Sequence, residues 1–280
     1  MAGWAAVNLW GAATIGFALS SVVLLGLSRI DGRQLEGEST WSKPFKFGVS
    51  LAVHFGTFAT VSRYLPASQL HSAWLQSTAV ASVVAGLIVF GYIWVQAARR
   101  RRSHFNTRTS LEATLSILMG VGALVVLSPA FIIGVDVATT ALPGWTAALR
   151  VGVAIGLLAG AVLTLLTGMQ MGGARSHFVG SSSTALRLMR LTGWSLDAAD
   201  LRPAHFLANH MMQALPLVAA VSSLLLRPAP AWLLTMAVAC GWVAVTCAVF
   251  RAALAGKPLP RSWGMLARPA GKLLDVHCPD

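Results

Sequence analysis

Two histidines of this chain lie inside long apolar segments, where an imidazole needs a polar partner. His54 is nine residues into the segment 45–65, and His210 is eight residues into the segment 202–226. At about 1.5 Å per helical residue, both imidazoles would lie roughly 12–14 Å from the same end of their helices. A polar residue at such a depth in a membrane is a candidate for function. The alternative is that each histidine is only a hydrogen-bond partner between helices.

The two segments also carry polar residues spaced four apart. These are Lys46, Ser50 and His54 in the first segment and His205, Asn209 and Gln213 in the second. In a helix, this spacing places the side chains on one face. We therefore predict that the two polar faces line one cavity open to the cytoplasm, with Ser50, Asn209 and Gln213 as ligand-binding residues.

Such a cavity favours the transport or binding of a small solute or ion as the function. A second possibility is a redox protein that binds haem b between facing helices. His54 and His210 would then be the axial ligands, and Lys46 and Arg202 would lie close enough to the same surface to meet the propionates.

A third possibility is a metal-dependent hydrolase within the membrane. Tetrahedral zinc would need three or four ligands, for which His54, His205, His210 and His104 are the candidates. The spacing of Ser50 and His54 is similar to that in seven-helix ceramidases and adiponectin receptors. The HxxxH pair that the last span of those proteins carries is missing here, and no enzyme class is assigned.

The composition identifies the surroundings of these residues as a lipid bilayer. Of the 280 residues, 56% are hydrophobic and only 11% are charged, whereas a soluble domain carries about 25% charged residues. The net charge of +12 could indicate a nucleic-acid partner. The basic residues lie in short connections between apolar runs, however, so the orientation rule for membrane proteins explains them instead.

Seven apolar runs are long enough to cross roughly 30 Å of hydrocarbon. They predict an all-α membrane bundle with spans at about 4–28, 45–65, 72–97, 111–135, 144–170, 202–226 and 230–255. A sheet is excluded because a backbone in contact with lipid must satisfy its own hydrogen bonds.

The basic residues predict the direction of the chain in the membrane. Of the 21 Lys and Arg residues, only Arg63, Arg150 and Arg227 fall on one side of this arrangement. The N-terminus is therefore predicted outside and the tail 256–280 in the cytoplasm. Arginine outnumbers lysine 17 to 4, which hints at a bacterial source and hence at the inner membrane of a bacterium. The cytoplasmic connection 171–201 is predicted to contain a short interfacial helix, in which basic and apolar residues alternate before Trp194.

Two of the predicted spans begin alike. Lys43-Pro44-Phe45-Lys46-Phe47 and Arg202-Pro203-Ala204-His205-Phe206 align at an offset of 159 residues, which also pairs Ser50 with Asn209. Spans one to three and five to seven run in the same directions. This pattern predicts a 3+1+3 arrangement with parallel repeats, as in sugar transporters of the SWEET type. The common preference for proline in the first turn of a helix is the alternative explanation.

Several motifs resemble those of a widespread family of uncharacterised bacterial inner-membrane proteins. They are Arg102-Ser103-His104-Phe105-Asn106, Leu191-Thr192-Gly193-Trp194-Ser195 and Asp200-Leu201-Arg202-Pro203-Ala204-His205-Phe206, the last running on through His210, Gln213 and Leu215-Pro216-Leu217. The chain has Ala199 and Ala208 where that family is expected to have glycine. The resemblance implies the same membrane architecture and draws attention to the same histidine-bearing helix, but it implies no activity.

Overall fold

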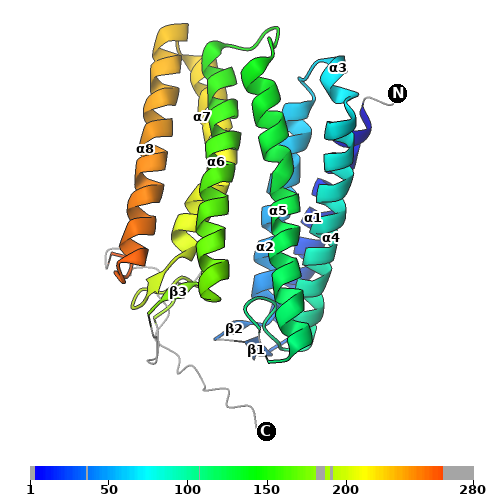
Figure 1. The fold of residues 1–280 in the computed structure, drawn as a ribbon, viewed down its shortest axis with the longest axis vertical. Coiled ribbons are helices and arrows are strands. Elements are labelled where there is room, and N and C mark those ends of the chain that lie inside the picture. Colours follow the sequence, from blue (N-terminus) through cyan, green and yellow to red (C-terminus); the bar gives the residue numbers. More distant parts are fainter. Residues whose placement is uncertain (1–3, 36, 107, 181–186, 190–191, 261–280) are drawn as a thin grey trace.

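The computed structural model describes residues 4–260, except 36, 107, 181–186 and 190–191, and it has the predicted all-α architecture (Figure 1). Its helices are α1 (Ala5–Ile30), α2 (Ser42–Ser62), the short α3 (Ala67–Leu70), α4 (Ala73–Ala98), α5 (Ser110–Thr139), α6 (Ala147–Ala174), α7 (Arg202–Leu225) and α8 (Pro228–Leu254). Hydroxyl caps begin three of them. Ser72, Thr109 and Thr146 each accept a hydrogen bond from an N–H in the first turn of α4, α5 and α6.

Two small antiparallel sheets lie at one end of the bundle, which we call the strand end (Figure 1). The strand β1 (Gln34–Leu35) pairs with β2 (Glu38–Ser39) between α1 and α2. The strand β3 (Phe178–Val179) pairs with β4 (Ala199–Asp200) between α6 and α7.

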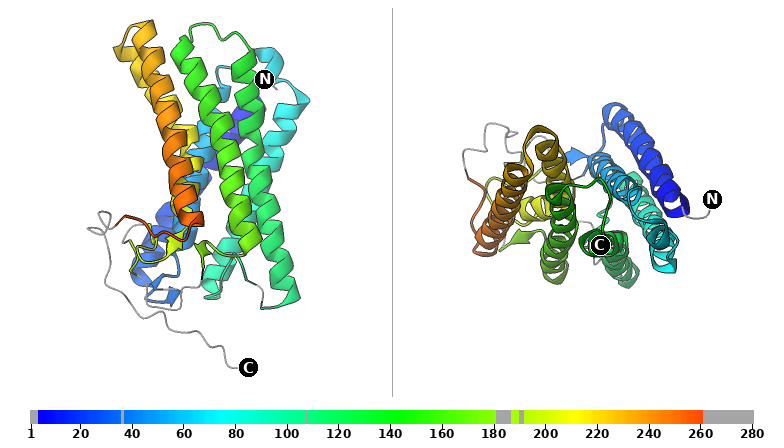
Figure 2. Two further views of the ribbon diagram at one scale, coloured as in Figure 1. Left: turned by 60° about the vertical axis from the view of Figure 1, so that its left-hand side comes forward. Right: turned by 90° about the horizontal axis from the view of Figure 1, so that it is seen from above.

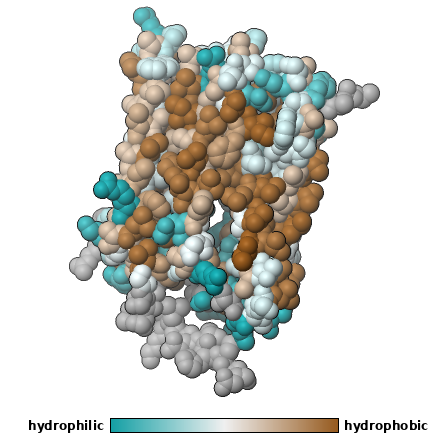
Figure 3. Space-filling view, in the orientation of Figure 1, coloured by the Kyte–Doolittle hydropathy of each residue, from teal (hydrophilic) through white to brown (hydrophobic). Residues whose placement is uncertain are grey.

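The seven predicted segments are all helical, and their observed ends lie within four residues of the predicted ones. Five of these helices, α1, α4, α5, α6 and α8, are long and apolar enough to cross a membrane. The chain is therefore a multi-pass membrane protein. Of the seven predicted spans, α2 and α7 do not reach this hydropathy, because the polar residues on these two helices lower it. In the space-filling view, apolar residues cover the helices and hydrophilic residues gather at both ends (Figure 3).

The two less apolar helices have protein neighbours on several sides. α2 packs against α1, α4, α5 and α7, and α7 packs against α6, α8 and α2. The view along the bundle shows this arrangement of neighbouring helices (Figure 2, right). Because other helices cover much of their surface, α2 and α7 can carry polar side chains without presenting them to lipid.

The helices form two groups of three. α1, α2 and α4 contact one another and are called the first half, while α6, α7 and α8 contact one another and are called the second half. α5 packs against α4 and α2 on one side and against α6 on the other. The surface is hollowed between the two halves towards the strand end (Figure 3).

Glycines on α6 bring the backbones of α6 and α7 close together. Gly152, Gly156 and Gly160 are spaced four apart, so they share one face. A Cβ atom added at Gly156 would lie 2.9 Å from Cδ of Pro216 on α7, and one added at Gly160 would lie 2.8 Å from Cγ of Met212. Small residues at such contacts are typical of closely packed membrane helices.

The connection between α6 and α7 does not contain the predicted interfacial helix among its described residues. Leu188 pairs with Ser195 in an isolated antiparallel bridge, and the N–H of Met189 donates to the carbonyl of Trp194 at 2.9 Å. Gly193 has φ +70°, a left-handed conformation that forms a turn and would end a helix. The described Leu188 and Met189 therefore lie in a short hairpin and not in a helix, since a hairpin can also place basic and apolar residues on opposite sides. Residues 181–186 and 190–191 of this segment, and 261–280 of the predicted tail, lie outside the described residues.

Candidate functional site

The predicted polar faces of α2 and α7 meet where the two halves touch. Asn209 Nδ2 lies 3.5 Å from Ser50 Oγ, at the limit of a hydrogen bond, and Gln213 Nε2 donates to Thr57 Oγ1 at 3.3 Å. His210 Nδ1 lies 3.2 Å from Gln213 Oε1 on the same helix. All five side chains are partly buried. We call Ser50, Thr57, Asn209, His210 and Gln213 the interhelical polar site.

His54 is directed towards a different helix. Its imidazole is buried, and its Nε2 lies 3.2 Å from the carbonyl oxygen of Val126 on α5. Since a carbonyl only accepts hydrogen bonds, Nε2 must be the donor. The contact lies next to a turn of α5 that contains Pro129. Pro129 cannot donate to the carbonyl of Val125, and the hydroxyl of Ser128 bonds that carbonyl instead at 2.8 Å. His54 thus has the role of a hydrogen-bond partner between helices.

The four predicted metal ligands have separate partners. His205 Nδ1 lies 2.8 Å from Thr167 Oγ1 on α6, and His104 Nδ1 lies 3.1 Å from Ser103 Oγ in the connection between α4 and α5. Among the described residues, no group of three or more His, Cys, Asp or Glu side chains is placed to hold a metal ion. The predicted set of His54, His104, His205 and His210 is therefore not brought together.

The haem and hydrolase hypotheses gain no support from these contacts. The Nε2 atom of His54, which would bind iron opposite His210, donates to a backbone carbonyl instead. The proposed propionate partners have carboxylate partners within the chain, Lys46 with Glu38 and Arg202 with Asp200. The hydrolase hypothesis involves Ser50 and His54, but the hydroxyl of Ser50 lies within hydrogen-bond distance of Asn209 Nδ2.

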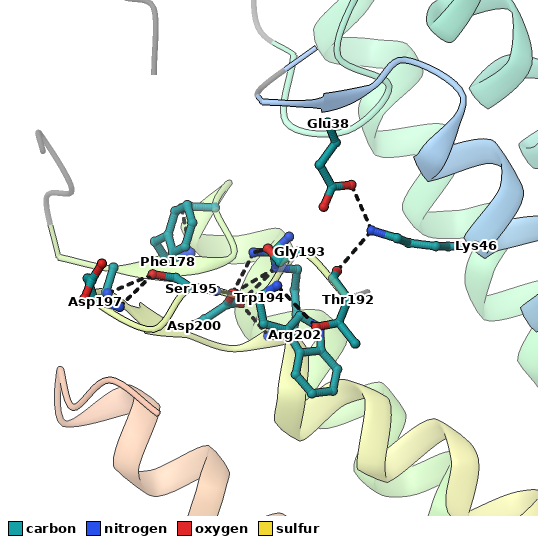
Figure 4. A network of polar contacts seen from close by, with 12 residues as sticks. Glu38, Lys46, Phe178, Thr192, Gly193, Trp194, Ser195, Asp197, Asp200 and Arg202 are labelled. Carbon is teal, nitrogen blue, oxygen red and sulfur yellow. Dashed lines mark hydrogen bonds and ion pairs between the residues drawn. The ribbon is translucent and has the colours of Figure 1, made fainter. Parts of the chain in front are cut away.

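A second polar cluster lies at the strand end and connects the two halves (Figure 4). Lys46 Nζ on α2 donates to Glu38 Oε2 on β2 at 2.8 Å and to the carbonyl oxygen of Thr192 at 3.1 Å. Thr192 belongs to the connection that leads into α7. The strand β2 is itself held in place, because Thr40, the residue after it, donates through Oγ1 to the carbonyl of Ala97 at the end of α4.

Asp200 organises the start of α7 from a fully buried position. It accepts hydrogen bonds from the backbone N–H of Ser195 and from that of Arg202, both at 3.0 Å. Its Oδ2 lies 2.6 Å from Arg202 Nη2, and the Asp200 side chain is 0% exposed. A buried carboxylate is tolerated when it is paired and hydrogen-bonded in this way. Arg202 in turn donates to the carbonyl of Gly193 at 2.8 Å and lies over the ring of Phe178.

Burial lowers the pKa of two histidines at the strand end, both from the sequence Arg-Ser-His-Phe, which occurs at 102–105 and again at 175–178. For His177, burial and then the positive charge of Arg202 lower the pKa to about 4, so the imidazole is neutral at pH 7. For His104, burial and then the charge of Lys43 hold the pKa well below its ordinary value. The two copies of the motif therefore place neutral imidazoles beside basic residues.

Sequence reasoning found most of the interhelical polar site but missed the acidic half of the strand-end cluster. Asp200 had a recognisable signal, because an aspartate just before a helix is a common capping residue. Glu38 had no such sequence signal, apart from being an acidic residue in a basic connection. The chain matches none of the protein-family models, curated proteins or solved structures with which it was compared. The family resemblance therefore stays a prediction.

Proposed function

We propose that this chain binds a small polar solute between its two halves and carries it across the inner membrane of a bacterium. The interhelical polar site is the observation that supports this function. It joins hydroxyl, amide and imidazole groups from α2 and α7 at the contact between two separately packed groups of helices. Transporters commonly bind their substrates at such an interface between repeats. The family resemblance is part of the proposal, since its motif residues Asp200, Arg202, His205, His210 and Gln213 lie on α7 or directly before it.

The proposal includes seven spans, with the N-terminus outside and the strand end in the cytoplasm. α2 and α7 have 21 and 24 residues, which is enough to cross the hydrocarbon core with their polar residues turned inward. A fluorescent protein fused after Lys257 is expected to mature in the cytoplasm, and a phosphatase inserted after His71 is expected to be active in the periplasm. The reverse result would refute this orientation.

A 3+1+3 parallel repeat is also part of the proposal. Each half has the order helix, two short strands, helix, and a further long helix. Ser50 and Asn209, which the offset of 159 residues makes equivalent, contact each other. Equivalent residues of two units related by a rotation meet near the rotation axis, as they do in a two-fold arrangement. This contact supports an approximate two-fold axis between α2 and α7, directed along the membrane normal.

The chemistry of the site favours a neutral solute with several hydrogen-bonding groups. In the described helices the acidic residues are Glu112 and Asp136, towards opposite ends of α5, so no carboxylate lies at the depth of Asn209. Cations are usually held by carboxylates or clustered carbonyl groups. Hydroxyl and amide groups instead match the donors and acceptors of sugars, polyols or amides.

Thermal unfolding of the purified protein with a panel of such solutes tests the proposal. A solute at about 100 times its Kd stabilises the folded state by about 2.7 kcal/mol. The shift should disappear in the double variant Asn209→Leu/Gln213→Leu. It should persist in Thr246→Val, which removes a hydroxyl that bonds the carbonyl of Trp242 within α8. Solutes that pass this test would then be followed into proteoliposomes.

Two results would overturn the proposal. One is that each solute of the panel either leaves the unfolding temperature of the wild-type protein unchanged or shifts that of the double variant as well. The other is a Soret band in the visible spectrum of the protein purified from cells, which would establish bound haem.

A further inference from the structure

We propose that Lys46, Glu38 and the turn Thr192-Gly193 form a latch that joins the two halves at the strand end and controls access to the interhelical polar site. This inference rests on the proposed function, because it assigns a gate to the same site. Lys46 lies one helical turn from Ser50 on the same face of α2, so the latch lies at the strand end, next to that site.

The contacts of Lys46 cross from one half to the other. Its ammonium group is 2.8 Å from Glu38 Oε2, within the first half, and 3.1 Å from the carbonyl oxygen of Thr192, which leads into the second half (Figure 4). The Lys46 and Glu38 side chains are 36% and 21% exposed. A partly exposed pair of this kind contributes little to stability and can break and reform. That property suits a latch better than a permanent brace.

Gly193 lets the turn approach the Glu38 carboxylate. A Cβ atom at this position would lie 2.0 Å from Glu38 Oε1, and its φ of +70° disfavours any other residue. The turn has contact with Glu38 from the first half, while its second carbonyl, that of Gly193, accepts from Arg202 Nη2 at 2.8 Å. Two cations from different halves thus bind consecutive carbonyl groups of one turn.

The two halves do not hold the turn equally firmly. On the second half, Arg202 is anchored by the buried Asp200, which also bonds the backbone of Ser195. On the first half, the ammonium group of Lys46 is at the end of a flexible side chain. The turn and α7 should therefore move together, and the contacts that break on opening are those of Lys46 and Glu38.

Cysteine labelling in lipid nanodiscs tests the latch without a ligand and independently of orientation. Cys240, Cys247 and Cys278 are first replaced by alanine, and Ser50→Cys then serves as the probe for a polar maleimide. We expect Lys46→Gln to increase the labelling rate several-fold, because it removes the ion pair and weakens the contact with Thr192. Gly193→Ala should act in the same direction by displacing Glu38.

Arg187→Gln is the matched control, since Arg187 pairs with Asp197 within the connection of the second half, at 2.7 Å. It removes an ion pair of similar length in the same region without separating the halves, so its labelling rate should match that of the parent. A second probe at Thr246→Cys on α8 should label at the same rate in every variant, which excludes general unfolding. If Lys46→Gln and Gly193→Ala label Ser50→Cys no faster than Arg187→Gln does, the latch is refuted.

Salt gives an independent readout. Raising the ionic strength from 0.01 M to 1 M shortens the Debye length from about 30 Å to about 3 Å and weakens an exposed pair. The labelling rate of the parent should therefore rise with salt, and that of Lys46→Gln should not. Equal salt dependence in both would also refute the latch. Because accessibility is measured directly, faster labelling without any solute-induced stabilisation would leave the latch standing and remove the proposed function.

Discussion

The contact between α6 and α7 allows a sharp test of the packing of the second half. A Cβ atom added at Gly152 would lie 2.4 Å from Cβ of Ala219, 3.0 Å from Cγ2 of Thr235 and 3.2 Å from the carbonyl oxygen of Leu215. Carbon atoms in favourable contact are about 3.5–4.0 Å apart. Gly152→Ala therefore requires α6 and α7 to separate by about 1 Å.

Overpacking of this kind typically costs about 1–3 kcal/mol. The higher helix propensity of alanine offsets up to about 1 kcal/mol of that cost. With the full offset, the net expectation is a loss of up to about 2 kcal/mol in the free energy of unfolding. It can be measured by titration with SDS in mixed micelles, followed by far-ultraviolet circular dichroism.

Gly241→Ala is the control, because an added Cβ at this position on α8 meets no atom within 4 Å. It should be neutral or slightly stabilising. The double variant Gly152→Ala/Ala219→Gly removes the closest clash and should recover part of the loss, which gives a coupling energy between the two sites. If Gly152→Ala is no less stable than Gly241→Ala, the close approach of α6 and α7 is wrong.

Three further outcomes are expected. His54→Leu removes the hydrogen bond to Val126 and should lower the free energy of unfolding by about 0.6–1.7 kcal/mol in the same SDS titration, whereas no change would mean that the bond contributes nothing. Asp200→Asn leaves the Arg202 guanidinium without its buried carboxylate and should cost about 3 kcal/mol, clearly more than Asp197→Asn at the exposed pair with Arg187. The pKa of His177 is lowered to about 4, so the unfolded state binds the proton more tightly than the folded state does. The contribution of the neutral His177 imidazole to the free energy of unfolding is therefore fully present above about pH 6.5 and is lost as the pH falls towards 4. Limited proteolysis at the strand end should therefore accelerate over that range, and less steeply in His177→Gln.

The positions of the helices could be predicted because hydrocarbon imposes one requirement on each segment, namely a long apolar run with its backbone bonded internally. The end of α5 shows where that reasoning loses accuracy. The predicted span stops at 135, yet the helix continues to Thr139, since outside the hydrocarbon core the apolar pattern no longer marks the helix end. The connection between α6 and α7 was harder still, because the Gly193 turn and the Leu188–Ser195 bridge depend on contacts with other segments.

The candidate site was predictable to the extent that it depends on spacing within one helix. The four-residue intervals correctly placed Ser50, Asn209 and Gln213 at the contact between α2 and α7. They did not place His54, which lies on the same side of α2 as Ser50 but bonds α5. A helix with several neighbours has polar residues that serve different neighbours, and periodicity alone does not say which neighbour each one meets.

The polar residues of α2 and α7 also explain why these two helices fall short of the hydropathy of a membrane span. Their polar residues bond specific neighbouring helices. His54 bonds α5, His205 bonds α6, and Ser50 and Asn209 bond α2 to α7. In a helix that faced lipid, each of these groups would have to be satisfied within the helix or would destabilise it. The other long helices of the bundle are strongly apolar. The low hydropathy of α2 and α7 thus indicates that these two helices have protein neighbours on several sides. In the proposed function, this is also the pair of helices between which the polar solute is bound.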